Sequence, residues 1–243
     1  YYKAYEDAIN DIGRVANGRG PINSPGISVK LSAIHPRYDF ANYDRVMNEL
    51  TPRLKQLALL AKKYDIGFTV DAEEANRLDL SLDVIGAVFA DPELDGWEGY
   101  GLAVQAYQKR AYYVLEWLAD LSTKVGRKMM VRLVKGAYWD TEVKFSQENG
   151  FEGYPCFTRK ASTDVSYLAC AKLMLSRRDA FYCQFASHNA HTVASILEMA
   201  GNDRTFEFQR LHGMGEALYG QIVDKAGENV PCRVYAPVGT HED

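Results

Sequence analysis

Seven short apolar runs divide this sequence, and helix-like stretches separate them. The runs cover residues 26–33, 66–73, 100–107, 128–136, 180–189, 206–214 and 233–239. Strands that alternate with helices are typical of a parallel sheet, whose carboxyl ends all lie at one edge. Polar side chains stand at or near the ends of the runs, so the pattern predicts that they meet at that edge. They are Lys30, Asp71, Gln105, Arg132, Lys135, His188, Gln209, His212 and Tyr235.

A (βα)8 barrel of the TIM type builds its active site at such an edge. The 243 residues, of which 47% are hydrophobic, suit one domain of this class over residues 1–243. Because a barrel has eight strands and the sequence shows seven runs, we expect a partial barrel, cut from a longer chain, without its first strand and closing helix. An open doubly wound sheet would carry a GxGxxG motif after its first strand, and GYGLAV, GMGEAL and GRGPIN do not match it.

Helical periodicity of apolar residues predicts several helices between the runs. A proline at position 52 should either start the first of them or kink it. The segments 17–26 and 91–99 are rich in turn residues and are predicted to be loops. The predicted helices cover residues 42–63, 107–125, 160–177, 190–200 and 215–226.

The composition excludes several classes of protein. A net charge of −4 argues against a nucleic-acid-binding surface on this segment. No apolar stretch approaches the ~20 residues that a membrane helix needs. The first residues, YYKAYEDAIN, do not resemble a secretory signal. The four cysteines lack zinc-site spacing, which suits reduced thiols in a cytoplasmic enzyme.

The stretch VRLVKGAYW places Arg132 and Lys135 at the end of a buried run. Buried cations need an anionic or electron-rich partner. Tyr138 and Trp139 offer flat surfaces for a heteroaromatic ring. Alternatively, both cations pair with the acids of DAEEA, and Tyr138 and Trp139 pack against the protein without binding a ligand.

Two carboxylates, Asp71 and Glu73, are expected on one face of their strand. They could bind a metal, act as a base or neutralise Lys30 and Arg132. Gln105 can donate and accept hydrogen bonds, which suits the edge of a flavin, a nucleobase or a substrate amide, although hydrogen bonding within the core would suit it almost as well.

Two further clusters precede helices. His188 and His191 in SHNAH have a spacing that leaves a metal site open. The same segment, Ser187–Asn189, stands at a helix start and could hold a phosphate, as could Thr158, Arg159 and Lys160. A Schiff-base lysine at position 30 or 135 is disfavoured, because nearby acids would keep it charged.

Eight motifs carry a resemblance to a known family: ISVKLSAIHPRY, DAEEANRL, QAYQKR, RLVKGAYWD, EGYPCFTRK, SHNAH, LHGMGE and YAPVGTHE. In this order and over nearly the whole chain, they resemble the proline dehydrogenase domain of the bifunctional proline utilization A (PutA) flavoenzymes. The resemblance implies a (βα)8 barrel that binds FAD non-covalently and oxidises L-proline to Δ1-pyrroline-5-carboxylate by hydride transfer to flavin N5. It also implies that electrons pass to a quinone, which would bring an otherwise cytoplasmic protein into peripheral contact with the membrane.

The resemblance assigns roles to individual residues. Lys30, Asp71, Tyr138, Leu211 and Tyr235 would form the substrate side, where Lys30, Asp71 and Tyr235 act together with Arg132. No residue is assigned to a metal, which replaces the metal interpretation of the histidines. The flavin-binding positions would be Gln105, Arg132, Val134, Lys135, Gly136, Ala137, Trp139, Thr158, Arg159, Lys160, Ser187, His188 and Asn189.

The resemblance also implies parts that this sequence does not contain. The closing helix of the family carries an arginine pair that clamps the proline carboxylate. An aldehyde dehydrogenase half would follow in the parent chain.

Overall fold

A computed structural model describes residues 1–223 and 230–238. Its central feature is a sheet of seven parallel strands in the order of the sequence. Each strand falls on or at the edge of a predicted apolar run, so the prediction of seven parallel strands is confirmed. The strands are β1 (Ile27–Val29), β2 (Phe68–Val70), β3 (Tyr100–Gln105), β4 (Met129–Val134), β5 (Phe181–Ala186), β6 (Glu207–Leu211) and β7 (Cys232–Tyr235).

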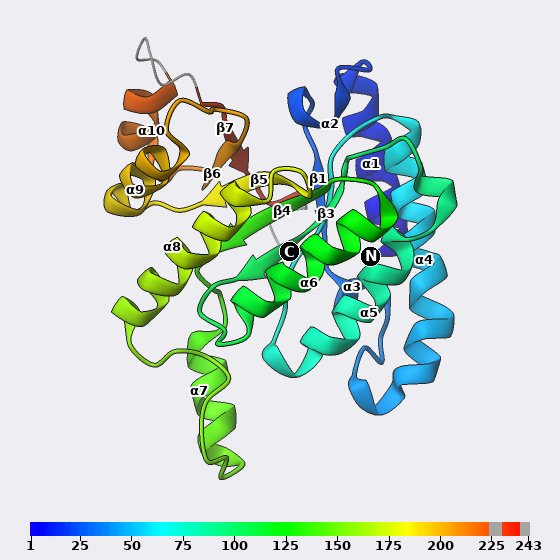
Figure 1. Cartoon of the computed structure of the whole chain (residues 1–243). Helices are drawn as coiled ribbons and strands as arrows, with labels where there is room; N and C mark the ends of the chain where they lie inside the picture. Colours follow the sequence, from blue (N-terminus) through cyan, green and yellow to red (C-terminus); the bar gives the residue numbers. More distant parts are fainter. Residues whose placement is uncertain (224–229, 239–243) are drawn as a thin grey trace.

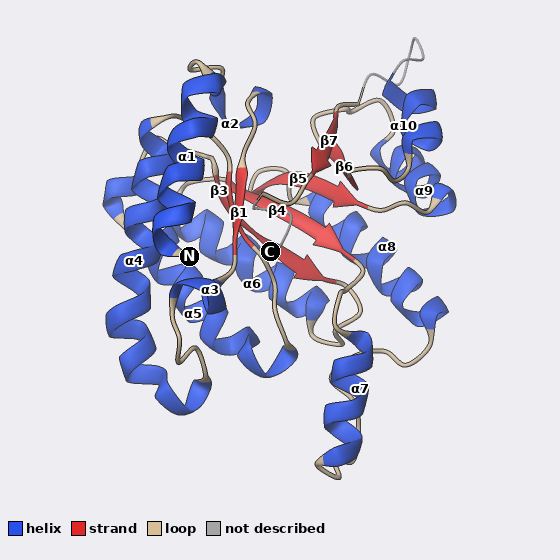
Figure 2. Cartoon of the chain, turned by 180° about the vertical axis from the view of Figure 1, so that it is seen from behind, coloured by secondary structure: helices blue, strands red, loops and turns tan. Residues whose placement is uncertain are grey.

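The sheet curls into a half-barrel with its helices on the outer side (Figures 1 and 2). Side chains that bond across the concave side bring distant strands together: Arg132 of β4 reaches Ser28 of β1, and Tyr235 of β7 reaches Asp71 after β2. This is the α/β barrel architecture that was predicted, with parts of the closed barrel lacking.

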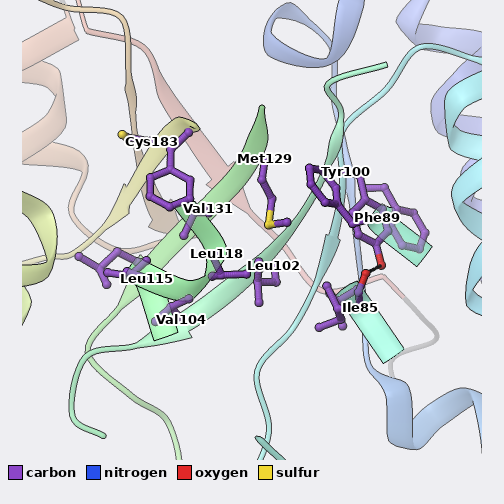
Figure 3. Close-up of a cluster of buried hydrophobic side chains, with 14 of the residues drawn as sticks. Ile85, Phe89, Tyr100, Leu102, Val104, Leu115, Leu118, Met129, Val131 and Cys183 are labelled. Atoms are coloured by element: carbon purple, nitrogen blue, oxygen red, sulfur yellow. Dashed lines mark hydrogen bonds between the residues drawn. The ribbon is translucent and has the colours of Figure 1, made fainter. Parts of the chain in front are cut away.

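The outer face of the sheet packs on the helices to form the core. Outward-facing Leu102 and Val104 of β3 and Val131 of β4 are buried against Ile85 and Leu115 of the helices (Figure 3). The three central strands contribute apolar residues at every second position, which fits the alternation of side chains along a strand. The concave face is therefore free to carry polar residues.

Helices between successive strands cover the outer face. All five predicted helices are present, and residues 224–226 of the last lie outside the described residues. The helix through Pro52 begins at Tyr43, so the alternative in which it starts at the proline is wrong. Its buried apolar face keeps the helix continuous although the proline cannot donate a backbone hydrogen bond. These helices are α4 (Tyr43–Lys63), α6 (Ala111–Val125), α8 (Lys160–Ser176), α9 (Ala190–Ala200) and α10 (Glu216–Val223).

Other helices differ from the sequence expectation. The predicted loop 17–26 contains a short helix, α2 (Gly20–Asn23), because Pro21 suits a first helical turn. The predicted loop 91–99 contains the 3-10 turn η3 (Pro92–Leu94). The remaining helical elements are α1 (Tyr2–Ala16), α3 (Leu31–Ile34), η1 (Phe40–Asn42), η2 (Ala75–Arg77), α5 (Leu78–Phe89) and α7 (Trp139–Glu148). In the described part of the chain, no helix has the length and apolar character needed to cross a bilayer.

Candidate active site

A cavity of about 630 Å³ opens at the carboxyl ends of the strands. This volume lies in the range of small-molecule and cofactor sites. Residues from β3, β4, β5, β6 and β7, from the segments after β1, β2, β4 and β5 and from the start of α8 line it, so one site draws on the whole sheet. The lining residues used below are Lys30, Asp71, Gln105, Arg132, Lys135, Gly136, Tyr138, Lys160, His188, Gln209 and Tyr235.

Arg132 is the best-anchored cation of this cavity. Its side chain is about nine-tenths buried. Nε donates to Gln209 Oε1 at 2.8 Å, Nη1 to Asp71 Oδ1 at 2.6 Å and Nη2 to Ser28 Oγ at 2.6 Å. The guanidinium also lies 5.0 Å from the centre of the Tyr235 ring. Three of its five N–H donors are thus satisfied by described residues, and two remain for a ligand.

Asp71 connects this arginine to the last strand. Its Oδ2 accepts a 3.0 Å hydrogen bond from the Tyr235 hydroxyl, while its Oδ1 accepts from Arg132. Burial and the Asp71 carboxylate raise the pKa of Tyr235 to about 12. The hydroxyl therefore keeps its proton at neutral pH and acts as a hydrogen-bond donor.

Lys30 supplies a second cation at the opening after β1. Its Nζ donates to the Tyr138 hydroxyl at 3.2 Å. This hydrogen bond, together with the charges of Asp71 and Glu73, holds the pKa of Lys30 above its ordinary value despite partial burial. A Schiff-base lysine needs a lowered pKa, so the structure argues against that chemistry at this position.

Gln105 spans two backbone segments at the floor of the cavity. Its Nε2 donates to the Glu73 carbonyl at 2.9 Å, and its Oε1 accepts from the Ala137 N–H at 3.0 Å. Gly136 has a φ of 148°, and a Cβ there would lie 2.4 Å from the Tyr107 ring. Only glycine fits this turn.

Two lysines of the cavity share one carboxylate. Asp164 of α8 accepts from Lys135 and from Lys160, the latter at 2.6 Å. Both ammonium groups, Lys135 first, hold the pKa of Asp164 below its ordinary value. The pairing of Lys135 with DAEEA that the sequence left open is therefore wrong, whereas that of Arg132 with Asp71 is confirmed.

His188 lies between two strand ends and accepts a hydrogen bond from the Leu211 N–H at Nε2, at 3.1 Å. Asn189 caps α9 by accepting from the Thr192 N–H at 2.9 Å. Among residues 1–223 and 230–238, no three His, Cys, Asp or Glu side chains gather closely enough to hold a metal ion. The geometry thus gives no support to the metal interpretation of His188 and His191.

Comparison with known proteins agrees with this geometry. The family model described as proline dehydrogenase matches residues 1–243. The chain belongs to the proline dehydrogenase family. It is 57% identical to the bifunctional protein PutA of Klebsiella aerogenes and 56% identical to that of Escherichia coli K12, in both cases over all of this chain and 19% of the relative. A solved structure of proline utilization A from Bradyrhizobium japonicum is 57% identical and superposes with a TM-score of 0.96, over 99% of this chain and 25% of that one.

The chain thus spans about a fifth of the length of these curated relatives. Within this half-barrel, most residues singled out in the sequence meet in one cavity. Those that line it are Lys30, Asp71, Gln105, Arg132, Val134, Lys135, Gly136, Ala137, Tyr138, Lys160, Ser187, His188, Asn189, Leu211 and Tyr235.

Three expected flavin positions are not among the lining residues: Trp139, Thr158 and Arg159. Trp139 begins α7 and donates from Nε1 to the Phe157 carbonyl at 3.0 Å. Thr158 and Arg159 lie exposed just before α8, and only the next residue, Lys160, reaches the cavity.

The expected carboxylate pair also separates. Strand β2 ends at Val70, so Asp71 and Glu73 do not share a strand face. Glu73 turns away, accepting from the Ser32 N–H at 3.0 Å and from Arg77 at 2.8 Å.

Sequence reasoning gave no role to Gln209 and did not single out Ser28, which both bind Arg132. The available signal was the alternation in GISVK, which places Ser28 on the same strand face as Lys30, and in FEFQRL, which places Gln209 on the same face as Glu207.

Proposed function

We propose that this chain carries the proline dehydrogenase site of a longer flavoenzyme, which oxidises L-proline to Δ1-pyrroline-5-carboxylate with FAD as cofactor. The observation that carries the proposal is the cavity at the strand ends, where Lys30, Asp71, Arg132 and Tyr235 meet in a chain of this family. Electrons would pass to a quinone.

The residues present suit FAD. The cavity has the volume of a cofactor site, and Arg132 keeps two N–H donors beyond those used by the protein. Gln105 retains one N–H and one lone pair for the edge of a heteroaromatic ring. The cations Lys135 and Lys160 and the capped start of α9 suit a pyrophosphate.

We assign the ring system to Gln105, Arg132, Val134, Lys135, Gly136, Ala137 and Trp139. The ribityl, pyrophosphate and adenine portions would fall to Thr158, Arg159, Lys160, Ser187, His188 and Asn189. Of these, Trp139, Thr158 and Arg159 do not line the cavity themselves but adjoin the lining residues Tyr138 and Lys160 in the chain. Bound FAD would supply the chemistry of hydride acceptance at N5 from C5 of proline.

The protein would contribute binding, orientation and charge. Lys30, protonated and held by Tyr138, would bind the proline carboxylate. Asp71 and Tyr235 would enclose the substrate ring, with Leu211 as an apolar wall. Arg132, fixed by three acceptors, would place positive charge where negative charge develops during the reaction.

The wider setting is part of the proposal and is supported by the similarity to bifunctional PutA proteins. An aldehyde dehydrogenase half of the same chain would take the product, and the quinone would be met at the membrane surface by an otherwise cytoplasmic protein. We propose no nucleic-acid contact through this segment, whose net charge is −4.

Turnover tests the proposal. The intact protein is incubated with L-proline and a soluble quinone, and the product is identified by mass. We expect Δ1-pyrroline-5-carboxylate in amounts equal to the quinone reduced, and a large loss of rate in an Arg132→Met variant. A protein that holds flavin but produces no such product would refute the substrate assignment.

A further inference from the structure

Among the described residues, the concave side of the sheet carries two largely buried ion pairs. The first pair is Arg132 with Asp71, and both residues line the cavity. The second pair is Arg233 of β7 with Glu207 of β6, and the Glu207 side chain is 2% exposed. Burying a charge is costly unless it is paired and hydrogen-bonded, so each pair requires further partners.

Gln209 joins these two pairs. Its Nε2 donates to Glu207 Oε1 at 2.7 Å, and its Oε1 accepts from Arg132 Nε at 2.8 Å. An ionised carboxylate only accepts hydrogen bonds and a guanidinium only donates them. A side chain between the two must therefore donate on one side and accept on the other. The neighbours of Gln209 thus determine which way its amide points.

Glu207 is itself held firmly. Arg233 donates to it from Nε at 2.8 Å and from Nη2 at 2.9 Å, and Gln184 Nε2 donates at 2.9 Å. Arg233 in turn donates to the carbonyls of Ser24 at 2.5 Å and Ile22 at 2.8 Å, in the segment before β1. These contacts hold the Glu207 carboxylate in one position, and through Arg233 they tie it to the segment before β1.

The contact at Nε completes the fixation of Arg132. Asp71 and Ser28 hold the two terminal nitrogens from the sides of β2 and β1, and Gln209 holds Nε from β6. Acceptors in three directions fix both the position and the plane of a planar group. Loss of the Nε contact would leave the plane free to tilt.

We propose that Gln209 is a positioning residue for Arg132 and that Glu207 acts through it, by setting the direction of the Gln209 amide. The proposal rests on the proposed function, because it concerns how the arginine assigned to the flavin N5 edge is held. Gln209 lines the cavity, but its amide is bonded to Arg132 on one side and to Glu207 on the other, so its proposed role is to hold Arg132.

The structure offers a matched control in Gln184. Gln184 and Gln209 are both 3% exposed, and both donate to Glu207 Oε1. Only Gln209 accepts from Arg132. The variants Gln184→Met and Gln209→Met therefore lose the same kind of hydrogen bond to the same carboxylate, and only one of them releases the arginine.

The test measures the flavin midpoint potential of the intact protein by titration with a chemical reductant, together with the rate of anaerobic reduction by proline. We expect the two variants to lower the melting temperature similarly. Only Gln209→Met should destabilise the reduced flavin relative to the oxidised flavin, by about tenfold in the equilibrium constant. For a two-electron reduction this is a midpoint potential about 30 mV more negative. It should also slow reduction by proline at least tenfold while the KM for proline changes less than twofold. Equal potentials and equal reduction rates in the two variants would overturn the proposal.

A double variant tests the part played by Glu207. If Glu207 acts through Gln209, Glu207→Met, which removes the acceptor that orients the Gln209 amide, lowers the potential as Gln209→Met does, and the double variant lowers it no further. Additive shifts would show that Glu207 does not act through Gln209. A wild-type protein that holds flavin but is not reduced by proline refutes the substrate assignment alone, since the potentials are measured without proline. A wild-type protein that holds no flavin overturns both proposals.

Discussion

Asp71 provides the sharpest test of how the site is held together. It accepts one hydrogen bond from Arg132 at 2.6 Å and one from Tyr235 at 3.0 Å, and its side chain is 14% exposed. Two variants separate its charge from its shape. Asp71→Asn keeps the shape and a neutral acceptor, and Asp71→Ala removes both contacts.

The magnitudes follow from the contacts. Exchanging charged for neutral hydrogen bonding costs about 1 kcal/mol, and removing both bonds costs about 3 kcal/mol. Arg132 keeps Gln209 and Ser28, so the larger cost of a fully unpaired buried charge is not reached. If this lost interaction energy raises the activation free energy in full, kcat/KM for proline falls roughly fivefold for Asp71→Asn and about 150-fold for Asp71→Ala.

The control is Asp79→Asn, which breaks a surface pair. Asp79 accepts from Arg110 at 2.8 Å, but the Arg110 side chain is 45% exposed and that of Asp79 is 65% exposed. Exposed pairs contribute little, so kcat/KM should stay within twofold of the wild type. The assay is steady-state proline oxidation by the intact protein with an artificial electron acceptor. Retention of wild-type kcat/KM in Asp71→Ala would refute the reasoning.

Three further perturbations test separate contacts. Lys30→Met should raise the KM for proline about tenfold or more with a smaller change in kcat, because a charged hydrogen bond to the carboxylate is lost; an unchanged KM would exclude Lys30 from substrate binding. The pKa of Tyr235 is raised from its ordinary 10.0 to about 12, so the proton is retained and the folded state loses stability from this group only as pH rises between those values. Tyr235→Phe should therefore lower kcat/KM a few-fold without moving any inflection of the pH profile below about pH 9, and a lost inflection would contradict this. Gly136→Ala should reduce bound flavin per polypeptide, because its Cβ would meet the Tyr107 ring at 2.4 Å with φ at 148°, whereas Gly153→Ala, with open space around it, should not; equal flavin content in both variants would contradict the role given to this turn.

The strands and most of the cavity could be predicted because both depend on local pattern. A run such as GLAV followed by Gln105 is apolar because its strand is buried, and its polar end marks the edge of the sheet. Parallel pairing then brings the strand ends together whatever lies between them.

Helix α7 could not be predicted in the same way. It projects from the body of the molecule (Figure 1), and its buried residues are the polar Glu142 and Ser146. A helix with little apolar surface to bury has no stripe for periodicity to detect.

The sequence also could not predict which charged side chains pair with each other. Lys135 pairs with Asp164, 29 positions away, rather than with the acids of DAEEA, which lie farther away in the sequence. Glu73 does not line the cavity, because β2 ends at Val70 and the chain after it no longer alternates as a strand does. Such choices depend on where a strand ends and how a helix is rotated, which local pattern does not specify.

The most direct test of the account is the absorbance spectrum of the intact protein before and after anaerobic addition of L-proline. We expect a flavin spectrum whose long-wavelength band bleaches with about one proline per flavin, and much more slowly in Arg132→Met. A flavin band that proline leaves unchanged, or a protein that carries no flavin at all, would contradict the central claim that this cavity is a proline-oxidising flavin site.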